Sequence, residues 1–310
     1  MTLLMIIPLL CTNFYVIHQL QPHNNEGAVE LQHAINIDID TGQSSVLAVD
    51  TAIIITSSWI PSHPSTRMID TVINSIEYLV GLPKRTPIFI TIDGFPDESF
   101  KNITHLSQKM NSLDGYTTAL FHRYLSSPHM HIIPGAKHSH IGGSVFKAMT
   151  LVQAHYPSVQ YIYYLQHDFS FVKEVDHMAL ADVMTTYPNT VNYIRFKYEY
   201  IFPRFEQCGN ATKIIHPKSQ SAGSKGNDDL ANEGTVTLVP TNTYSDNNHF
   251  VRFEWYFRTI ASISNLRRPP EFPLQIRQSA MCKNMQQSMG LFLYDPIVLR
   301  HLNGREKPQS

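Results

Sequence analysis

The stretch Tyr161-Ile162-Tyr163-Tyr164-Leu165-Gln166-His167-Asp168-Phe169-Ser170-Phe171-Val172 indicates the fold class. Its first five residues are uncharged and either β-branched, aromatic or aliphatic, which is typical of a central parallel strand covered on both faces. The strand ends abruptly on three polar residues, Gln166, His167 and Asp168. In open α/β sheets the functional groups lie just beyond the carboxyl ends of such strands. Asp168 therefore occupies a position where a functional carboxylate is expected.

Short apolar strands alternate with amphipathic helices before this stretch. Strands are predicted at residues 52–58, 87–92 and 130–133. Three helices are predicted from sets of apolar residues that recur at helical spacing and face inward. The sets are Met68, Val72, Ile73, Ile76 and Leu79; Phe100, Ile103, Leu106 and Met110; and Val145, Ala148, Met149 and Val152. The second of these helices is predicted to end near Leu113. This alternation predicts an α/β, Rossmann-like fold, with a mostly parallel central sheet and helices on both faces.

The pattern is less regular after Asp168. We expect a helix at about residues 176–187, strands at 191–196 and 235–239, and a helix over Phe250–Ile263. A polar segment, Thr241–His249, separates the last strand from this helix. The carboxyl-terminal half is thus predicted to be the more irregular part of one domain.

The amino-terminal residues divide into two segments ahead of that domain. Residues 1–20 are apolar and almost uncharged, and we interpret them as a signal or membrane anchor, with a strand of the domain as the alternative. Residues 21–45 are polar and predict a stem or linker, followed by a folded domain over residues 46–306. Two sequons, at Asn102 and Asn210, would be glycosylated only in a lumenal domain.

The net charge bears on nucleic-acid binding, and the cysteines bear on disulfide formation. The formal net charge of −1 gives no indication of a nucleic-acid partner. Cys208 and Cys282 could form one disulfide, or both could be unpaired thiols.

Polar side chains at three strand ends are expected to converge at one edge of the sheet. Ser57, Asp93 and Asp168 each follow a predicted parallel strand. A hydroxyl or carboxylate there can pair with the base or ribose of a nucleotide, and the diphosphate requires a divalent cation. Because Asp168 alone would bind such an ion weakly, we expect a second ligand, for which His301 is the candidate; imidazole favours Mn²⁺ over Mg²⁺.

These motifs resemble those of the GT-A-fold glycosyltransferases over about Val46 to Arg305. Gln166-His167-Asp168 occupies the place of that family's Asp-x-Asp motif, with Gln in place of the first acid. The closing segments Gly290–Tyr294 and His301–Arg305 resemble the late region in which such enzymes place a metal-binding histidine. The resemblance implies a nucleotide-sugar donor, a divalent metal (Mn²⁺ or Mg²⁺) and a glycan or other hydroxyl acceptor bound over the later half. A lumenal domain in the Golgi or another secretory compartment is the expected location, with the cytoplasm as the alternative.

Individual roles follow from this interpretation. Gln166 can still offer a carbonyl oxygen, and with His167 it is assigned to donor binding. Arg305 could pair with the donor phosphates, or it could be a solvated charge of the tail. The base that removes the acceptor proton in an inverting transfer is predicted to be Asp246, or else Glu254, which could equally be a solvated helix charge. The aromatic set suited to sugar stacking is Phe250, Phe253, Trp255 and Tyr256.

Two other functions are alternatives to glycosyl transfer. The replacement of the first acid by Gln166 is compatible with a non-catalytic carbohydrate-binding relative of the same fold. His138-Ser139-His140 has the His-x-His spacing of metal hydrolases, although no regular set of carboxylates accompanies it. A loop or acceptor-side role is the alternative for these histidines.

Overall fold

The computed structural model describes residues 49–58, 65–94, 103–135, 138–199, 213–217, 235–263, 270–283 and 289–302. The chain divides into two units, Met1–Val46 and Leu47–Ser310, and every described residue belongs to the second. The predicted anchor and stem, both sequons, the Cys208–Cys282 pairing and Arg305 lie outside the described residues. No helix within the described ranges is long and apolar enough to cross a membrane.

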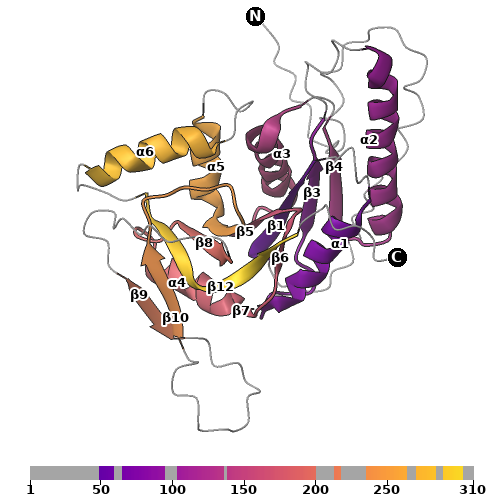
Figure 1. Ribbon diagram of the computed structural model, residues 1–310. Helices are drawn as coiled ribbons and strands as arrows, with labels where there is room; N and C mark the ends of the chain where they lie inside the picture. Colours follow the sequence, from indigo (N-terminus) through magenta and orange to yellow (C-terminus); the bar gives the residue numbers. More distant parts are fainter. Residues whose placement is uncertain are drawn as a thin grey trace, which may run out of the picture. The chain divides into compact units, whose positions relative to one another are not determined.

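A ten-stranded sheet forms the centre of the second unit (Figure 1). Its first part consists of four parallel strands in the order β4-β3-β1-β5. Their bounds are β1 (Thr51–Ser57), β3 (Ile88–Ile92), β4 (Met130–Pro134) and β5 (Tyr161–Gln166). These strands confirm the parallel sheet predicted from the sequence.

The sheet continues beyond β5 with strands of mixed direction. The order is β5-β11-β8-β12-β10-β9, and β6 pairs with the far end of β12. The bounds are β6 (Phe169–Phe171), β8 (Tyr193–Tyr198), β9 (Ile214–Pro217), β10 (Thr235–Pro240), β11 (His249–Arg252) and β12 (Leu291–His301). Strands β8 and β12 run in the direction of β5, whereas β11, β10 and β6 run against it. A separate pair joins β2 (Leu79–Val80) to β7 (Val175–Asp176).

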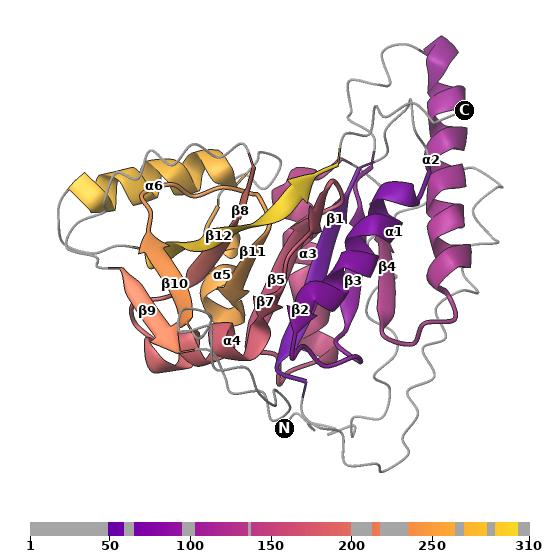
Figure 2. The ribbon, with the colours of Figure 1, turned by 60° about the horizontal axis from the view of Figure 1, so that its bottom comes forward.

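Helices cover both faces of the sheet (Figure 2). One apolar core includes side chains of α1 (Arg67–Asn74), α2 (Ile103–Tyr124) and α4 (His177–Thr186), and a short 3₁₀ helix (Ser75–Tyr78) follows α1. The other core includes side chains of α3 (His140–His155), α5 (Phe253–Ala261) and α6 (Glu271–Lys283). Because side chains alternate along a strand, Tyr163 and Leu165 enter the first core while Ile162 and Tyr164 enter the second.

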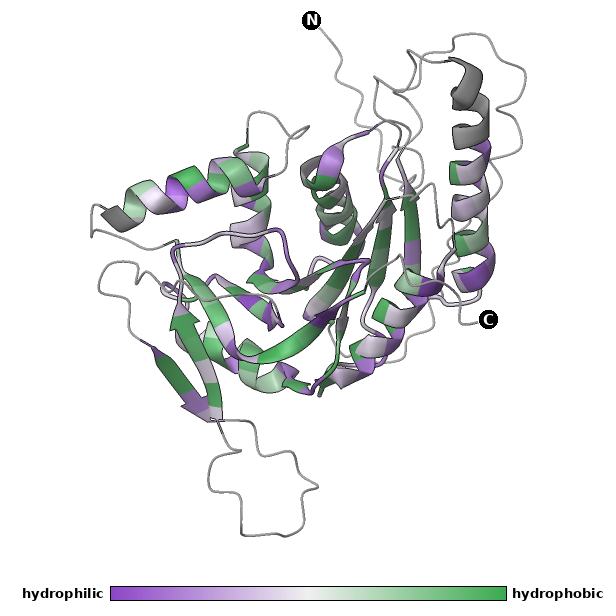
Figure 3. Cartoon of the chain, in the orientation of Figure 1, coloured by the Kyte–Doolittle hydropathy of each residue, from purple (hydrophilic) through white to green (hydrophobic). Residues whose placement is uncertain are grey.

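The tyrosines of β5 bury their hydroxyl groups with partners. Tyr163 is bonded to His177 Nδ1 at 3.1 Å, Tyr164 to Thr56 Oγ1 at 2.9 Å, and Tyr161 to Thr185 Oγ1 at 2.9 Å. A buried hydroxyl without a partner would cost roughly 1–3 kcal/mol. Residues 161–165 can therefore be buried although three of the five side chains carry a polar atom. The hydropathy colouring shows hydrophobic residues along the strands of the sheet (Figure 3).

The predicted end of α2 was wrong, and of its predicted inner face only Met110 has a side chain that the structure describes. The helix runs through Gly115 to Tyr124, well beyond Leu113, although Asp114-Gly115 is typical of a turn. Among residues 110–124 the buried side chains are Tyr116, Leu120 and Tyr124, whereas Met110 is 44% exposed. Packing against the sheet therefore outweighs the helix-breaking tendency of one glycine.

The predicted helix over Phe250–Ile263 was also wrong at its start. Residues 249–252 form β11, which is inserted between β5 and β8, and the helix begins only at Phe253. A four-residue strand is too short for its alternation to be distinguished from helical spacing. The insertion buries Phe250, Phe253 and Tyr256 in the core, so these three rings are not available for sugar stacking.

We expect Gly115→Ala to stabilise the folded chain by about 0.5–1 kcal/mol, because alanine lowers the entropic cost of fixing a helical backbone. The position is exposed and helical, and no atom lies within 4 Å of the place that an added Cβ would occupy. Chemical denaturation of the two proteins measures the difference.

Gly290→Ala is the matched control for this substitution. Gly290 has a φ of +75°, and a Cβ there would lie 2.6 Å from the Thr190 carbonyl oxygen. The control should lose about 1–2 kcal/mol or more. Equal effects of the two substitutions would contradict the path of α2.

Candidate functional site

The parallel strands place a topological switch point between β1 and β5. From β1 the chain proceeds to β3 and β4 on one side, and it then returns to form β5 on the other side of β1. Ligands of open α/β sheets bind at the carboxyl ends of strands that flank such a point. The ends are held together here: His167 donates its backbone N–H to Thr56 O at 3.1 Å, and Asp93 donates to Ser57 O at 3.0 Å.

Asp168 and His301 are brought together at this edge. The end of β12 pairs with β6, so that His301 lies opposite Phe169, and Leu302 N donates to Asp168 O at 2.6 Å. His301 Nε2 lies 3.2 Å from Asp168 Oδ2. The two side chains are 39% and 29% exposed, so both are accessible to a ligand.

The pair fits the donor set of one divalent ion. A carboxylate oxygen and an imidazole nitrogen are both ligands of Mn²⁺. Adjacent ligands of an octahedral ion with bonds of about 2.1 Å lie roughly 3 Å apart, close to the observed separation. The described ranges hold no group of three or more His, Cys, Asp or Glu side chains that could bind a metal.

Asn248 holds the turn that carries the predicted motif. Its side chain is fully buried, its Oδ1 accepts from Gln166 N at 2.8 Å, and its Nδ2 donates to Phe169 O at 3.1 Å. The two bonds fix both ends of the turn that contains His167 and Asp168. The sequence did not reveal this role, because Asn247-Asn248 between two strands is typical of an ordinary loop.

His167 is half-buried beside this turn. Burial lowers the pKa of its imidazole, and the nearby charge of Asp168 acts in the opposite direction. The effect of burial is the larger, which favours a neutral ring.

Asp246 lies at the same end of β5 but is buried. Its side chain is 6% exposed, and it accepts a hydrogen bond from the backbone N–H of Glu271, the first residue of α6. Burial, followed by the charge of Glu271, raises the pKa of Asp246 to about 8. No described residue provides a hydrogen-bond partner for its Oδ1. The charges of Asp246 and Asp168 both raise the pKa of the Tyr164 hydroxyl, after the larger effect of burial. Because His249 of the antiparallel β11 pairs with Tyr164, residue 246 lies beyond the carboxyl end of β5.

Asp93 is engaged by the loop that precedes α3. Its Oδ1 accepts from Gly94 N at 3.0 Å and from Ser139 N at 2.8 Å, and its Oδ2 lies 2.8 Å from His138 Nδ1. The other ring nitrogen of His138 is bonded to His140 Nδ1 at 3.0 Å. Asp93 and His140 thus lie at the two ring nitrogens of His138.

Three other predicted residues are placed away from the open edge or beyond the described ranges. Ser57 is 4% exposed and its hydroxyl is bonded to Tyr116 at 2.7 Å; burial raises the pKa of Tyr116 to about 12. Glu254 lies beyond the end of β11, at the opposite edge of the sheet, and forms an ion pair with Arg258 at 2.6 Å. Arg305 is outside the described residues. The structure thus joins Asp168 to His301 and places Asp246 beyond the same end of β5, whereas Glu254 lies at the opposite edge.

Comparisons with known proteins add similarities to solved structures. No protein-family profile matches the sequence, and no curated protein matches it. One S. aureus TarS structure shares 9% identity with this chain, with a TM-score of 0.44, over 82% of this chain and 60% of that one. A second S. aureus TarS structure shares 10% identity, with a TM-score of 0.42, over 82% of this chain and 37% of that one. A 4-diphosphocytidyl-2C-methyl-D-erythritol synthase structure has 9% identity and a TM-score of 0.38, over 84% of this chain and 94% of that one. Because these TM-scores lie below 0.5, we infer no relationship from them.

Asn248→Ala should destabilise the fold by about 2 kcal/mol or more, since it leaves two buried backbone groups without partners. Its neighbour provides the control: Asn247→Ala is expected to change the free energy of unfolding by less than about 0.5 kcal/mol. Urea denaturation measures both. Similar values for the two would show that Asn248 does not hold the turn.

Asp246→Asn should remove a pH dependence of stability. The unfolded chain releases this proton near pH 3.8, whereas the folded chain retains it to about pH 8. The folded state therefore binds more protons between these values, and stability falls as pH rises, by up to about 1.4 kcal/mol per pH unit. Thermal melts from pH 5 to 8 should show a smaller decrease for the variant than for the wild type. Parallel decreases would contradict the raised pKa.

Proposed function

We propose that this chain is a nucleotide-sugar-dependent glycosyltransferase of the GT-A type. The observation that carries the proposal is the approach of His301 to Asp168 at the switch point beside β5. Residues 133 positions apart in the sequence are joined there by strand pairing rather than by a mobile tail. An ion site at the carboxyl end of a central parallel strand is where a donor diphosphate would bind.

Asp168 and His301 would hold the divalent metal, Mn²⁺ or Mg²⁺. When bound, the ion supplies positive charge to the diphosphate leaving group. Asn248 positions Asp168 by fixing its turn, while Gln166 and His167 lie on the same turn, where the donor would pass. The nucleoside would lie over the ends of β1 and β3, where Asp93 orders the loop that carries His138.

The acceptor is proposed to be a glycan or another hydroxyl compound that approaches over the segment 241–248. Asp246 is the base candidate that lies at this edge. Only the ionised carboxylate can take a proton, and burial raises its pKa to about 8. Transfer that depends on Asp246 would accelerate as pH rises through this value.

Membrane attachment through residues 1–20 and a lumenal location in the secretory pathway form a further part of the proposal. The apolar composition of these residues supports it. The alternative is a cytoplasmic protein. Protease protection of the full chain in microsomes separates the two locations.

The second candidate function is a non-catalytic carbohydrate-binding protein of the same fold. Gln166 in place of an acid and the buried, raised-pKa carboxyl of Asp246 favour it. Such a protein would bind a donor or glycan without consuming it. Its affinity would not depend on Asp168.

The proposal predicts metal-dependent binding of a nucleotide sugar. Calorimetric titration of UDP- and GDP-sugars with Mn²⁺ should identify a donor whose affinity falls about tenfold or more in Asp168→Ala, because the variant loses a charged ligand of the ion. His301→Ala should weaken binding in the same direction, and donor hydrolysis should fall in parallel.

Glu254→Gln is the matched carboxylate control, because Glu254 lies at the opposite edge of the sheet. It should bind the donor as the wild type does. Failure of every donor to bind would contradict the proposal. Binding that is unchanged in Asp168→Ala would favour the non-catalytic candidate.

A further inference from the structure

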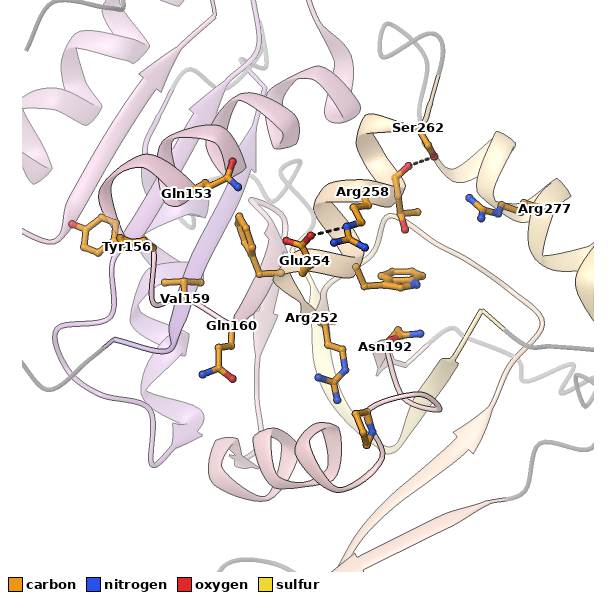
Figure 4. Close-up of a pocket in the computed structure, with 15 residues that line it drawn as sticks. Gln153, Tyr156, Val159, Gln160, Asn192, Arg252, Glu254, Arg258, Ser262 and Arg277 are labelled. Carbon is orange, nitrogen blue, oxygen red and sulfur yellow. Dashed lines mark hydrogen bonds and ion pairs between the residues drawn. The ribbon is translucent and has the colours of Figure 1, made fainter. Parts of the chain in front are cut away.

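We propose that the opposite end of β5 carries a second ligand site, which binds an acidic sugar unit through Arg252, Arg277 and Trp255. The site is a pocket of about 850 Å³, within the size range of roughly 300–1,000 Å³ that small-molecule sites have. Its walls come from the end of α3 and the loop that follows it, the end of β11, and helices α5 and α6 (Figure 4).

The pocket is separate from the proposed transfer site. It is lined by Gln160, which precedes β5, whereas Asp168 follows that strand. Arg252 lies opposite Tyr161, at the start of β5. Six strand residues at about 3.3 Å each place the two sites roughly 20 Å apart.

The charge of the lining favours an anion. Of the described residues, three arginines line the pocket, Arg252, Arg258 and Arg277, against a single acid, Glu254. That acid is already paired with Arg258, at 2.6 Å. The remaining positive charge belongs to Arg252 and Arg277, which reach the pocket from different elements, β11 and α6.

Arg252 has an unmet hydrogen-bonding group in this pocket. Its Nε donates to Val191 O at 3.0 Å, but its Nη2 is buried and has no hydrogen-bond partner in the part of the chain that the structure describes. Buried donors without partners are rare, and each requires an explanation. The planar guanidinium matches the geometry of a carboxylate, phosphate or sulfate, and a rotation of the Arg252 side chain that exposes Nη2 to the pocket would let an oxygen of such a group satisfy this nitrogen. Figure 4 shows the Arg252 side chain between Gln160 and Asn192.

The remaining lining favours a sugar over a bare inorganic anion. Trp255 and Tyr156 are partly exposed there, and Gln153 and Gln160 are exposed. Aromatic faces can pack on the apolar face of a sugar ring, while amide groups donate to and accept from its hydroxyls. An acidic sugar combines both requirements in one ligand.

The chain provides its own reporter for this site. It contains two tryptophans, Trp59 and Trp255, so Trp59→Phe leaves Trp255 as the only indole. In that background we expect a saturable change of fluorescence with glucuronic acid or glucose 6-phosphate. Glucose and inorganic phosphate should bind more weakly by about tenfold or more, because each lacks half of the interactions.

Arginine variants test the assigned contacts. Arg252→Gln and Arg277→Gln should each weaken binding of the acidic sugar by about tenfold or more. Arg277 lies on the exposed side of α6, so its variant serves if Arg252→Gln does not fold. Arg85→Gln removes the same charge from an exposed position outside the pocket and should bind as the parent does.

Several outcomes would overturn the inference. These are the absence of saturable binding, equal affinity for glucose or for phosphate alone, tighter binding of uridine monophosphate, or unchanged affinity in folded Arg277→Gln. Asp168→Ala should leave this binding intact. Failure of the second site is thereby distinguished from failure of the proposed transfer function.

Discussion

Burial of both faces of β5 is the constraint on which the rest of the structure depends. Every residue from Tyr161 to Leu165 is buried, and its three tyrosines need partners from β1 and α4 for their hydroxyl groups. Neighbouring strands cover both of its edges, β1 on one side and β11 on the other. A strand of this kind can expose polar residues only where it begins and where it ends.

The two proposed sites follow from that constraint. At the carboxyl end, Gln166-His167-Asp168 leaves the core beside β1 and meets His301 at the end of β12. At the amino end, Gln160 lies in a pocket with Arg252, the last residue of the antiparallel neighbour. The same strand thus separates an acidic edge suited to a metal from a basic pocket suited to an anion. Both proposed sites use charged side chains, which the buried middle of β5 does not carry.

The sequence predicted the parallel half of the fold because its signals are local. Continuous apolar runs and helical spacing placed β1, β3, β4, β5 and α3 close to their observed positions. The later half depends on contacts between distant segments. Four residues of β11 are too few for a period to be recognised, and packing of Tyr116, Leu120 and Tyr124 carries α2 past a glycine.

Site residues were predictable to the extent that they follow strands. The strand-end rule placed Asp168 and Asp93 at one edge of the sheet, and the need for a second metal ligand suggested His301; their binding roles remain predictions. The same rule also named Ser57, which is buried against Tyr116. Neither Asn248 nor the Arg252 pocket could be predicted in this way, because each depends on the insertion of β11 beside β5. The same insertion places Glu254 at the far edge, although it is only eight positions after Asp246 in the sequence.

The central claim is that Asp168 and His301 bind one divalent ion together. A double-mutant cycle tests it most directly, with Mn²⁺ affinity measured by electron paramagnetic resonance in the presence of UDP. If both side chains bind the same ion, each alanine variant should lose about tenfold or more in affinity, and the double variant should lose less than the two single effects combined. Affinity that is unchanged in either single variant, or losses that are strictly additive, would contradict the account.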